Sequence, residues 1–156
     1  MATLRAVLAS AIVLPGLAFA QSLAYMDADT PSEAVGMMKS TIFIAGKLEK
    51  ACSERYPQIG AEIAENHLKW KEAESAVIRK TEFYWARIVQ KQPKLADSFA
   101  YAESVVLKNL DMLGAAPGEA GVAVGTQFCR KHFADLASGI WRTRTPRAYA
   151  YLDKAP

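Results

Sequence analysis

The chain has 156 residues, of which 51% are apolar, and its charged side chains leave a net charge of +3. A charge this small offers no basic surface of the kind that binds nucleic acid, so we expect no nucleic-acid partner. The length suits a single domain that buries a sizeable core.

Residues 1–20 have the pattern of a cleavable secretory signal peptide. Arg5 supplies the positive region and an apolar stretch follows. Ala18 and Ala20 then place small residues where signal peptidase requires them. We expect cleavage between Ala20 and Gln21 and a periplasmic or secreted product.

The alternative interpretation of this apolar run is a membrane anchor. A spanning helix needs about 20 continuous apolar residues, whereas this run is interrupted by Pro15. No later run is long enough, so we expect no stable membrane insertion once residues 1–20 are removed. The remaining chain carries a net charge of +2 and divides into a helical domain, 21–140, and a basic, aromatic tail, 141–156.

The first predicted helix spans residues 30–55. Thr30 suits the N-cap, Pro31 the first helical position, and Glu33 completes a capping box. Tyr56 precedes Pro57 and ends the segment, because the residue before a proline avoids helical dihedral angles. One helical face carries the apolar stripe that consists of Val35, Met38, Ile42, Ala45, Leu48 and Cys52.

The second predicted helix spans residues 58–90, and its length leads us to expect that it bends or protrudes. Glu65 and Lys69 are four residues apart in the favourable order, which predicts an exposed ion pair. The apolar stripe has a helical period. It consists of Ile59, Ile63, His67, Trp70, Ala73, Val77, Thr81, Tyr84 and Ile88.

Two more helices are predicted over residues 94–113 and 119–138, each ending at a glycine, Gly114 and Gly139. Gly121 and Gly125 weaken the last helix but would allow a neighbour to approach closely. The two stripes consist of Leu95, Phe99, Ala102, Val106, Leu110 and Leu113, and of Val122, Gly125, Cys129, His132 or Phe133, and Leu136. Four amphipathic helices without strand signals predict an all-α fold, an antiparallel four-helix bundle.

The two cysteines of the chain lie on the first and last predicted helices. An exported protein with an even number of cysteines favours a disulfide. We therefore expect Cys52 and Cys129 to join the first helix to the last. A loop this long corresponds to about 4–5 kcal/mol of stabilisation on the chain-entropy model.

Cys129 belongs to the sequence FCRKHF, which is similar to the haem attachment motif C-x-x-C-H but has one cysteine instead of two. A haem held without covalent bonds between Met38 and His132 is the better ligand-binding alternative. Along straight helices Met38 lies about 21 Å from Cys52, whereas His132 lies about 4.5 Å from Cys129. The expected disulfide would therefore separate Met38 from His132, and we expect no cofactor.

Catalytic chemistry has few candidate residues in this chain. The two histidines are too few for a typical zinc site, and no G-x-S-x-G motif is present. Glu62, Glu65 and His67 are the one group that could perform acid–base catalysis, and an enzyme that uses them is an alternative. We expect a protein that is not an enzyme and that holds no metal.

Arginine and aromatic side chains are the candidates for partner binding, because both are enriched at protein interfaces. Trp85 is one candidate. The tail supplies the others, which are Trp141, Arg142, Arg144, Arg147, Tyr149 and Tyr151. The alternative for the tail is a strap whose rings pack over the helical domain.

The order of Cys52, Tyr56-Pro57, Trp70 and Cys129 resembles that of small exported helical proteins of Proteobacteria, many of which have no assigned activity. The resemblance implies an exported helical fold with paired cysteines, and it carries no catalytic residue across. We therefore predict an exported, non-enzymatic interaction protein, an accessory or inhibitory factor for a protein of the cell envelope. A bundle that binds haem or a small ligand through His132 is the alternative.

Overall fold

The computed structural model describes residues 27–113 and 118–155, so the expected signal peptide and its cleavage site lie outside the described residues. Within these ranges the chain forms seven α-helices and no strand. The elements are α2 (Pro31–Arg55), the 3₁₀-helix η2 (Pro57–Ile59), α3 (Gly60–Ala73), α4 (Ser75–Lys91), α5 (Lys94–Leu113), α6 (Gly118–Ala137), α7 (Ile140–Arg144) and α8 (Pro146–Lys154). The all-α prediction is confirmed, whereas a four-helix bundle is not.

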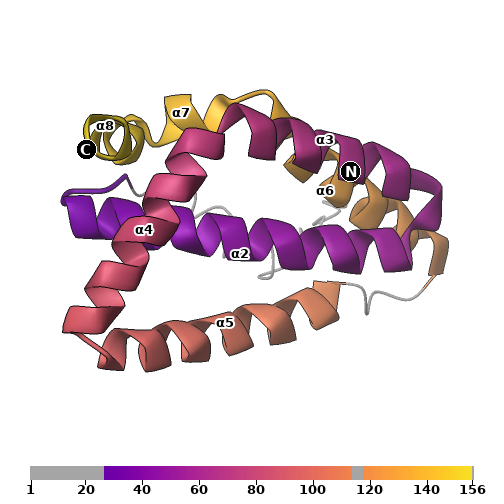
Figure 1. Cartoon of the computed structure of the whole chain (residues 1–156). Coiled ribbons are helices and arrows are strands. Elements are labelled where there is room, and N and C mark those ends of the chain that lie inside the picture. Colours follow the sequence, from indigo (N-terminus) through magenta and orange to yellow (C-terminus); the bar gives the residue numbers. More distant parts are fainter. Residues whose placement is uncertain (1–26, 114–117, 156) are drawn as a thin grey trace, which may run out of the picture.

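Helix α2 lies at the centre of the molecule and packs against α3, α4, α5, α6 and α8 (Figure 1). Its predicted capping box is confirmed, since Glu33 N donates to Thr30 Oγ1 and Thr30 N donates to Glu33 Oε2, both at 3.2 Å. The predicted stripe faces the core. Its residues Val35, Met38, Ala45, Leu48 and Cys52 are buried, and Ile42 is half-buried.

The predicted disulfide between Cys52 and Cys129 is confirmed, with a Cα–Cα distance of 6.0 Å. It joins the C-terminal end of α2 to α6. One turn before Cys129, a Cβ atom on Gly125 would overlap the ring and hydroxyl of Tyr56. Gly125 therefore allows the buried Tyr56, which follows α2, to pack closely against α6.

The predicted helix over residues 58–90 is broken at Glu74, which separates α3 from α4 with φ −100° and ψ 14°. The core stripe shifts at the break, because Ala73 is exposed and Glu74 is buried in its place. Arg142 of α7 donates to both carboxylate oxygens of Glu74, at 2.9 and 2.7 Å. This partner, distant in the sequence, explains why a carboxylate occupies a core position.

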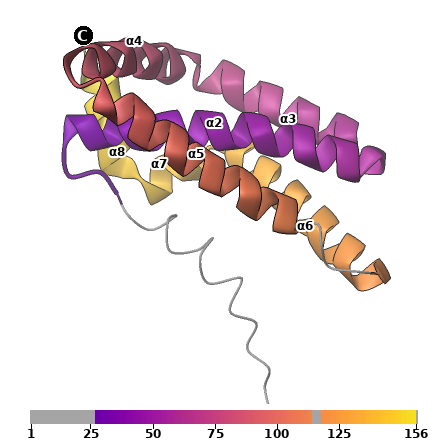
Figure 2. The same ribbon diagram turned by 90° about the horizontal axis from the view of Figure 1, so that it is seen from below.

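Helix α5 has the predicted bounds but packs loosely. It runs across α2 on one side of the molecule (Figure 2). Phe99 is half-buried, with ring centroids 4.8 Å from Trp85 and 6.4 Å from Phe43. Leu95 and Ala102, predicted to face the core, are exposed instead. The side chains of Val106, Leu110 and Leu113 lie outside the described part.

Helix α6 ends as predicted, because Gly139 adopts a left-handed conformation with φ 72°. Val122, which was predicted to face the core, is 50% exposed, so the first half of α6 buries less apolar surface than the sequence predicts. The core contacts of α6 come from its second half, where Cys129, Phe133 and Leu136 are buried.

The tail, for which the sequence shows no clear period, forms α8 and most of α7. Helix α8 packs against α2 and α4. Its last carbonyl groups are capped by Lys80 of α4, whose Nζ donates to the carbonyls of Leu152, Asp153 and Ala155 at 3.2, 3.1 and 2.6 Å. A cation at a helix C-terminus is favourable, so Lys80 fixes α8 to α4.

We expect Arg142→Ala to lower the free energy of unfolding by about 2–3 kcal/mol, because Glu74 would stay buried without its partner. The loss is less than that of a fully buried pair, since the Arg142 side chain is 43% exposed. Urea denaturation measures it. The double variant Arg142→Ala/Glu74→Gln should recover most of the lost free energy.

The matched control is Arg144→Ala, which removes a pair with the less buried Asp135. An equal loss of stability in Arg144→Ala would contradict the prediction.

Candidate functional site

The three residues predicted for acid–base catalysis do not come together. Glu62 pairs with Arg130 of α6 at 2.9 Å. Glu65 pairs with Lys69 at 2.7 Å, which confirms the predicted exposed pair. His67 points into the core, where its Nδ1 lies 2.5 Å from a carboxylate oxygen of Glu49. Each of the three residues thus has a separate partner, and they do not form one catalytic group.

Both histidines are part of an aromatic stack between α3 and α6. The ring of His67 stacks on Trp70 with centroids 5.7 Å apart and contacts Phe133 at 5.6 Å. His132 meets Phe133 edge to face at 5.2 Å. Burial lowers the pKa of His132 to about 4, against the opposing charge of Asp135. His132 is therefore neutral at pH 7 and packs as an aromatic residue.

Met38 and His132 occupy separate regions of the helical core. Met38 is buried on α2, which is continuous from Pro31 to Arg55 and carries the disulfide near its other end. The ring of His132 contacts Phe128, at 6.1 Å between centroids, as well as Phe133. In the described ranges, no three His, Cys, Asp or Glu side chains are grouped as metal ligands.

The tail residues named as partner-binding candidates make contacts within the chain. Arg144 pairs with Asp135 at 3.4 Å, and Arg147 pairs with Asp29 at 2.6 Å. The Tyr151 hydroxyl donates to the carbonyl of Asp29 at 3.0 Å. These contacts tie the tail to the start of α2 and to α6.

The remaining tail candidates are also covered by neighbours. Tyr149 is buried, and the guanidinium of Arg142 lies 4.5 Å from its ring centroid. Burial raises the pKa of Tyr149 to about 12, with a further contribution from the charge of Glu74. Trp141 is half-buried, and Arg144 lies 5.8 Å from its ring. Such contacts are those expected of a strap that packs over the helical domain.

A half-exposed aromatic side chain lies on α4, two residues before the candidate Trp85. Trp85 itself is half-buried against Phe99 of α5, whereas Phe83 is 54% exposed. Arg87 lies over the Phe83 ring at 5.4 Å. Arg79, Phe83 and Arg87 are four residues apart and share the solvent side of the helix. We call these three residues the α4 outer face.

The α4 outer face is cationic as well as aromatic. Neither of its arginines pairs with a carboxylate in the part of the chain that the structure describes. Glu82, the acidic residue beside Phe83 in the sequence, is held by Lys39 of α2 at 2.7 Å. Its charge is therefore neutralised by α2.

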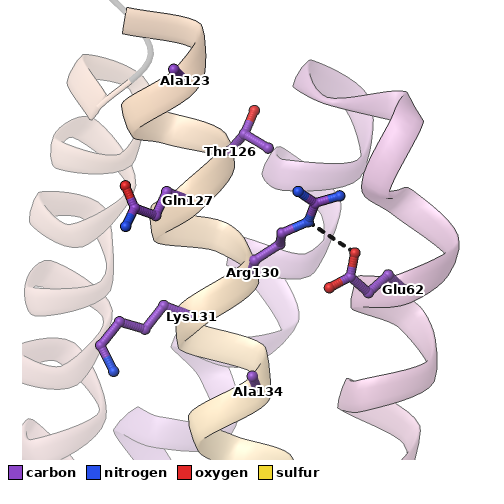
Figure 3. A pocket seen from close by; sticks show the side chains of 7 residues that line it. All are labelled: Glu62, Ala123, Thr126, Gln127, Arg130, Lys131 and Ala134. Carbon is purple, nitrogen blue, oxygen red and sulfur yellow. Dashed lines mark hydrogen bonds and ion pairs between the residues drawn. The ribbon is translucent and has the colours of Figure 1, made fainter. Parts of the chain in front are cut away.

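A groove of about 520 Å³ lies between α3 and α6 (Figure 3). The ion pair between Arg130 and Glu62 crosses it, and Lys131 points away from Glu62. Lys131 is engaged by Asp135 of its own helix at 3.0 Å. The charged side chains of this groove thus already have partners.

A second pocket, of about 400 Å³, lies at the bend between α3 and α4 and is bounded by α2. We call it the bend pocket. Its apolar walls are formed by Ile42, Trp70 and Ile78, and exposed Lys71 and Arg79 also line it. The α4 outer face and the bend pocket therefore share Arg79.

Comparisons with known proteins found no matching family model, no matching curated protein and no matching solved structure. None of the helices formed by the described residues combines the length and apolarity that crossing a membrane requires. The candidate sites therefore rest on their own geometry. The four-residue spacing of Arg79, Phe83 and Arg87 is visible in the sequence, but the bend pocket has no such local signal.

Proposed function

We propose that the protein is an exported, non-enzymatic interaction protein, an accessory or inhibitory factor for a protein of the cell envelope. The observation that carries the proposal is the α4 outer face, where Phe83 is 54% exposed between Arg79 and Arg87. Exposed aromatic rings and arginines are typical of the residues that dominate binding energy at protein interfaces. A partner that covers Phe83 would remove its apolar surface from water.

The charge of this face supports an acidic partner. Arg79 and Arg87 have no carboxylate partner among the described residues, and Glu82 is neutralised by Lys39. An acidic segment of an envelope protein, with an apolar side chain set against Phe83, would complement both features. The tail arginines offer less, because they already pair with carboxylates of this chain.

The disulfide supports the oxidising compartment that the proposal requires. Disulfides persist in oxidising environments and are rare in the cytosol of most organisms, so the Cys52–Cys129 bond supports export. The signal-peptide pattern of residues 1–20 points to the same compartment. The partner would accordingly belong to the periplasm or to the cell surface.

Site-specific photo-crosslinking in the producing cell tests the proposed interface. A photoreactive amino acid at position 83 should give one discrete adduct with an envelope protein. The matched control is position 124 on α6, where Val124 is 62% exposed and no adduct is expected. Equal adducts at both positions, or none at position 83, would count against the proposed face.

A charge-reversal variant tests the predicted chemistry of the partner. Arg87→Glu should reduce the adduct at position 83 by about tenfold, because it opposes an acidic segment at close range. Lys108→Glu on α5 makes the same change of net charge at another exposed site and should leave the adduct unchanged. An adduct that survives Arg87→Glu at full yield would exclude an acidic partner segment at this face.

A further inference from the structure

We propose that the bend pocket binds a small apolar carboxylate, an aliphatic acid whose chain lies against Ile42 and Ile78 and whose carboxylate meets Lys71 and Arg79. The proposal concerns a pocket and a small ligand rather than the partner surface, although Arg79 belongs to both. It rests on the size of the pocket, its walls, its open α2 side and its charges.

The size and walls of the bend pocket suit an aliphatic chain. Its volume of about 400 Å³ lies within the range of about 300–1,000 Å³ that is usual for small-molecule pockets. Half-buried Ile42 and Ile78 present the apolar surface of the pocket, and Trp70, which is 1% exposed and stacked on His67, closes the pocket behind them in a fixed position. Each methylene group that enters such a pocket should strengthen binding by roughly fourfold.

Gly46 keeps the α2 side of the bend pocket open. It lies in the middle of α2, where a glycine is less stable than an alanine. Packing does not require it, because a Cβ atom there would meet nothing within 4 Å. A larger side chain at this position would instead extend into the space that the pocket occupies.

The charges around the pocket favour an anion in one orientation. Lys71 and Arg79 are exposed, and neither has a carboxylate partner among the residues that are described. Glu49 is bound to Nδ1 of His67, which also lines the pocket. The negative charge of Glu49 disfavours a carboxylate beside His67, so the carboxylate of the ligand would lie at Lys71 and Arg79 and its chain against the apolar walls.

Isothermal titration calorimetry of the exported chain at pH 7 tests the ligand class. Decanoate, below its micelle concentration, should bind with a stoichiometry of one, and octanoate should bind about sixteenfold more weakly because it has two fewer methylene groups. Decyltrimethylammonium has a comparable chain with the opposite charge and should not bind. No saturable binding of decanoate, or equal binding of the cation, would overturn the proposal.

Variants locate the site. Gly46→Leu should weaken decanoate binding at least tenfold, because its side chain enters the part of the pocket beside α2. Gly36→Leu is the matched control, since Gly36 also lies on α2 with nothing within 4 Å of a Cβ atom. It should bind decanoate as the parent protein does. Arg79→Gln should lower the affinity for decanoate about tenfold, because a charge-assisted hydrogen bond to the carboxylate is lost.

Two results separate this inference from the proposed interaction and from misfolding. Gly46→Leu should retain the helical circular dichroism spectrum and the photo-adduct at position 83, because it changes neither Phe83 nor Arg87. Decanoate binding that is undiminished in Gly46→Leu would place the ligand elsewhere on the surface and refute the bend pocket as its site.

Discussion

Cys52→Ser is expected to lower the free energy of unfolding by about 4–5 kcal/mol, because it opens the loop that the disulfide closes. The bond joins residues 77 positions apart. On the chain-entropy model, closing such a loop restricts the unfolded state far more than the folded one. A domain of this size has a stability of roughly 5–15 kcal/mol, so the bond supplies a large share of it.

Urea denaturation of three variants and of the reduced parent protein checks this prediction. Cys52→Ser, Cys129→Ser, the double variant and the reduced parent protein should all lose a similar amount, since each breaks the same bond. A clearly greater loss in the double variant than in either single one would show that the serines disturb packing. A change below about 1 kcal/mol on reduction would contradict the chain-entropy argument, which predicts several times that value.

The helix ends were predictable because their signals are local. Thr30 and Glu33 form the capping box within one turn of α2, and Gly139 ends α6 through its own left-handed conformation. The disulfide was predictable for another reason, since a sequence with two cysteines allows one intramolecular pairing. None of these predictions requires knowledge of which helices are neighbours.

A bend in the helix over residues 58–90 was predicted from its length, but its place at Glu74 could not be, because the partner of Glu74 lies 68 residues away. Periodicity alone allows either Ala73 or Glu74 to follow Trp70 on the core side. An apolar residue is the ordinary choice, and only Arg142 makes the carboxylate acceptable there. Predicting the break therefore requires knowing that the tail returns to α4.

The candidate sites were predictable only in part. Phe83 and Trp85 lie on different sides of α4, so the sequence shows that both cannot face the core. Which ring is covered depends on where α5 lies, and Phe99 of α5 covers Trp85. The bend pocket depends on the break at Glu74 and on Gly46 together, and neither feature alone indicates a pocket.

Trp70→Ala is expected to lower the free energy of unfolding by about 3–5 kcal/mol, because a large ring would be removed from a fully packed site. Trp70 is 1% exposed and stacks on His67. Urea denaturation measures the loss. The matched control Trp85→Ala removes a half-buried ring and should have a clearly smaller effect. A near-zero change for Trp70→Ala would mean that α3 does not pack through this face.

A double-mutant cycle shows whether Trp70 and the tail form one structural unit. Tyr149 of α8 and Trp70 of α3 both belong to the buried core, and the guanidinium of Arg142 lies 4.5 Å from the centroid of the Tyr149 ring. Removing Trp70 should therefore loosen Tyr149 and weaken the pair between Arg142 and Glu74. We expect Trp70→Ala and Arg142→Ala to be non-additive by about 0.5 kcal/mol or more, as is usual for groups that share a partner. Strict additivity would mean that the tail is held independently of the α3 core.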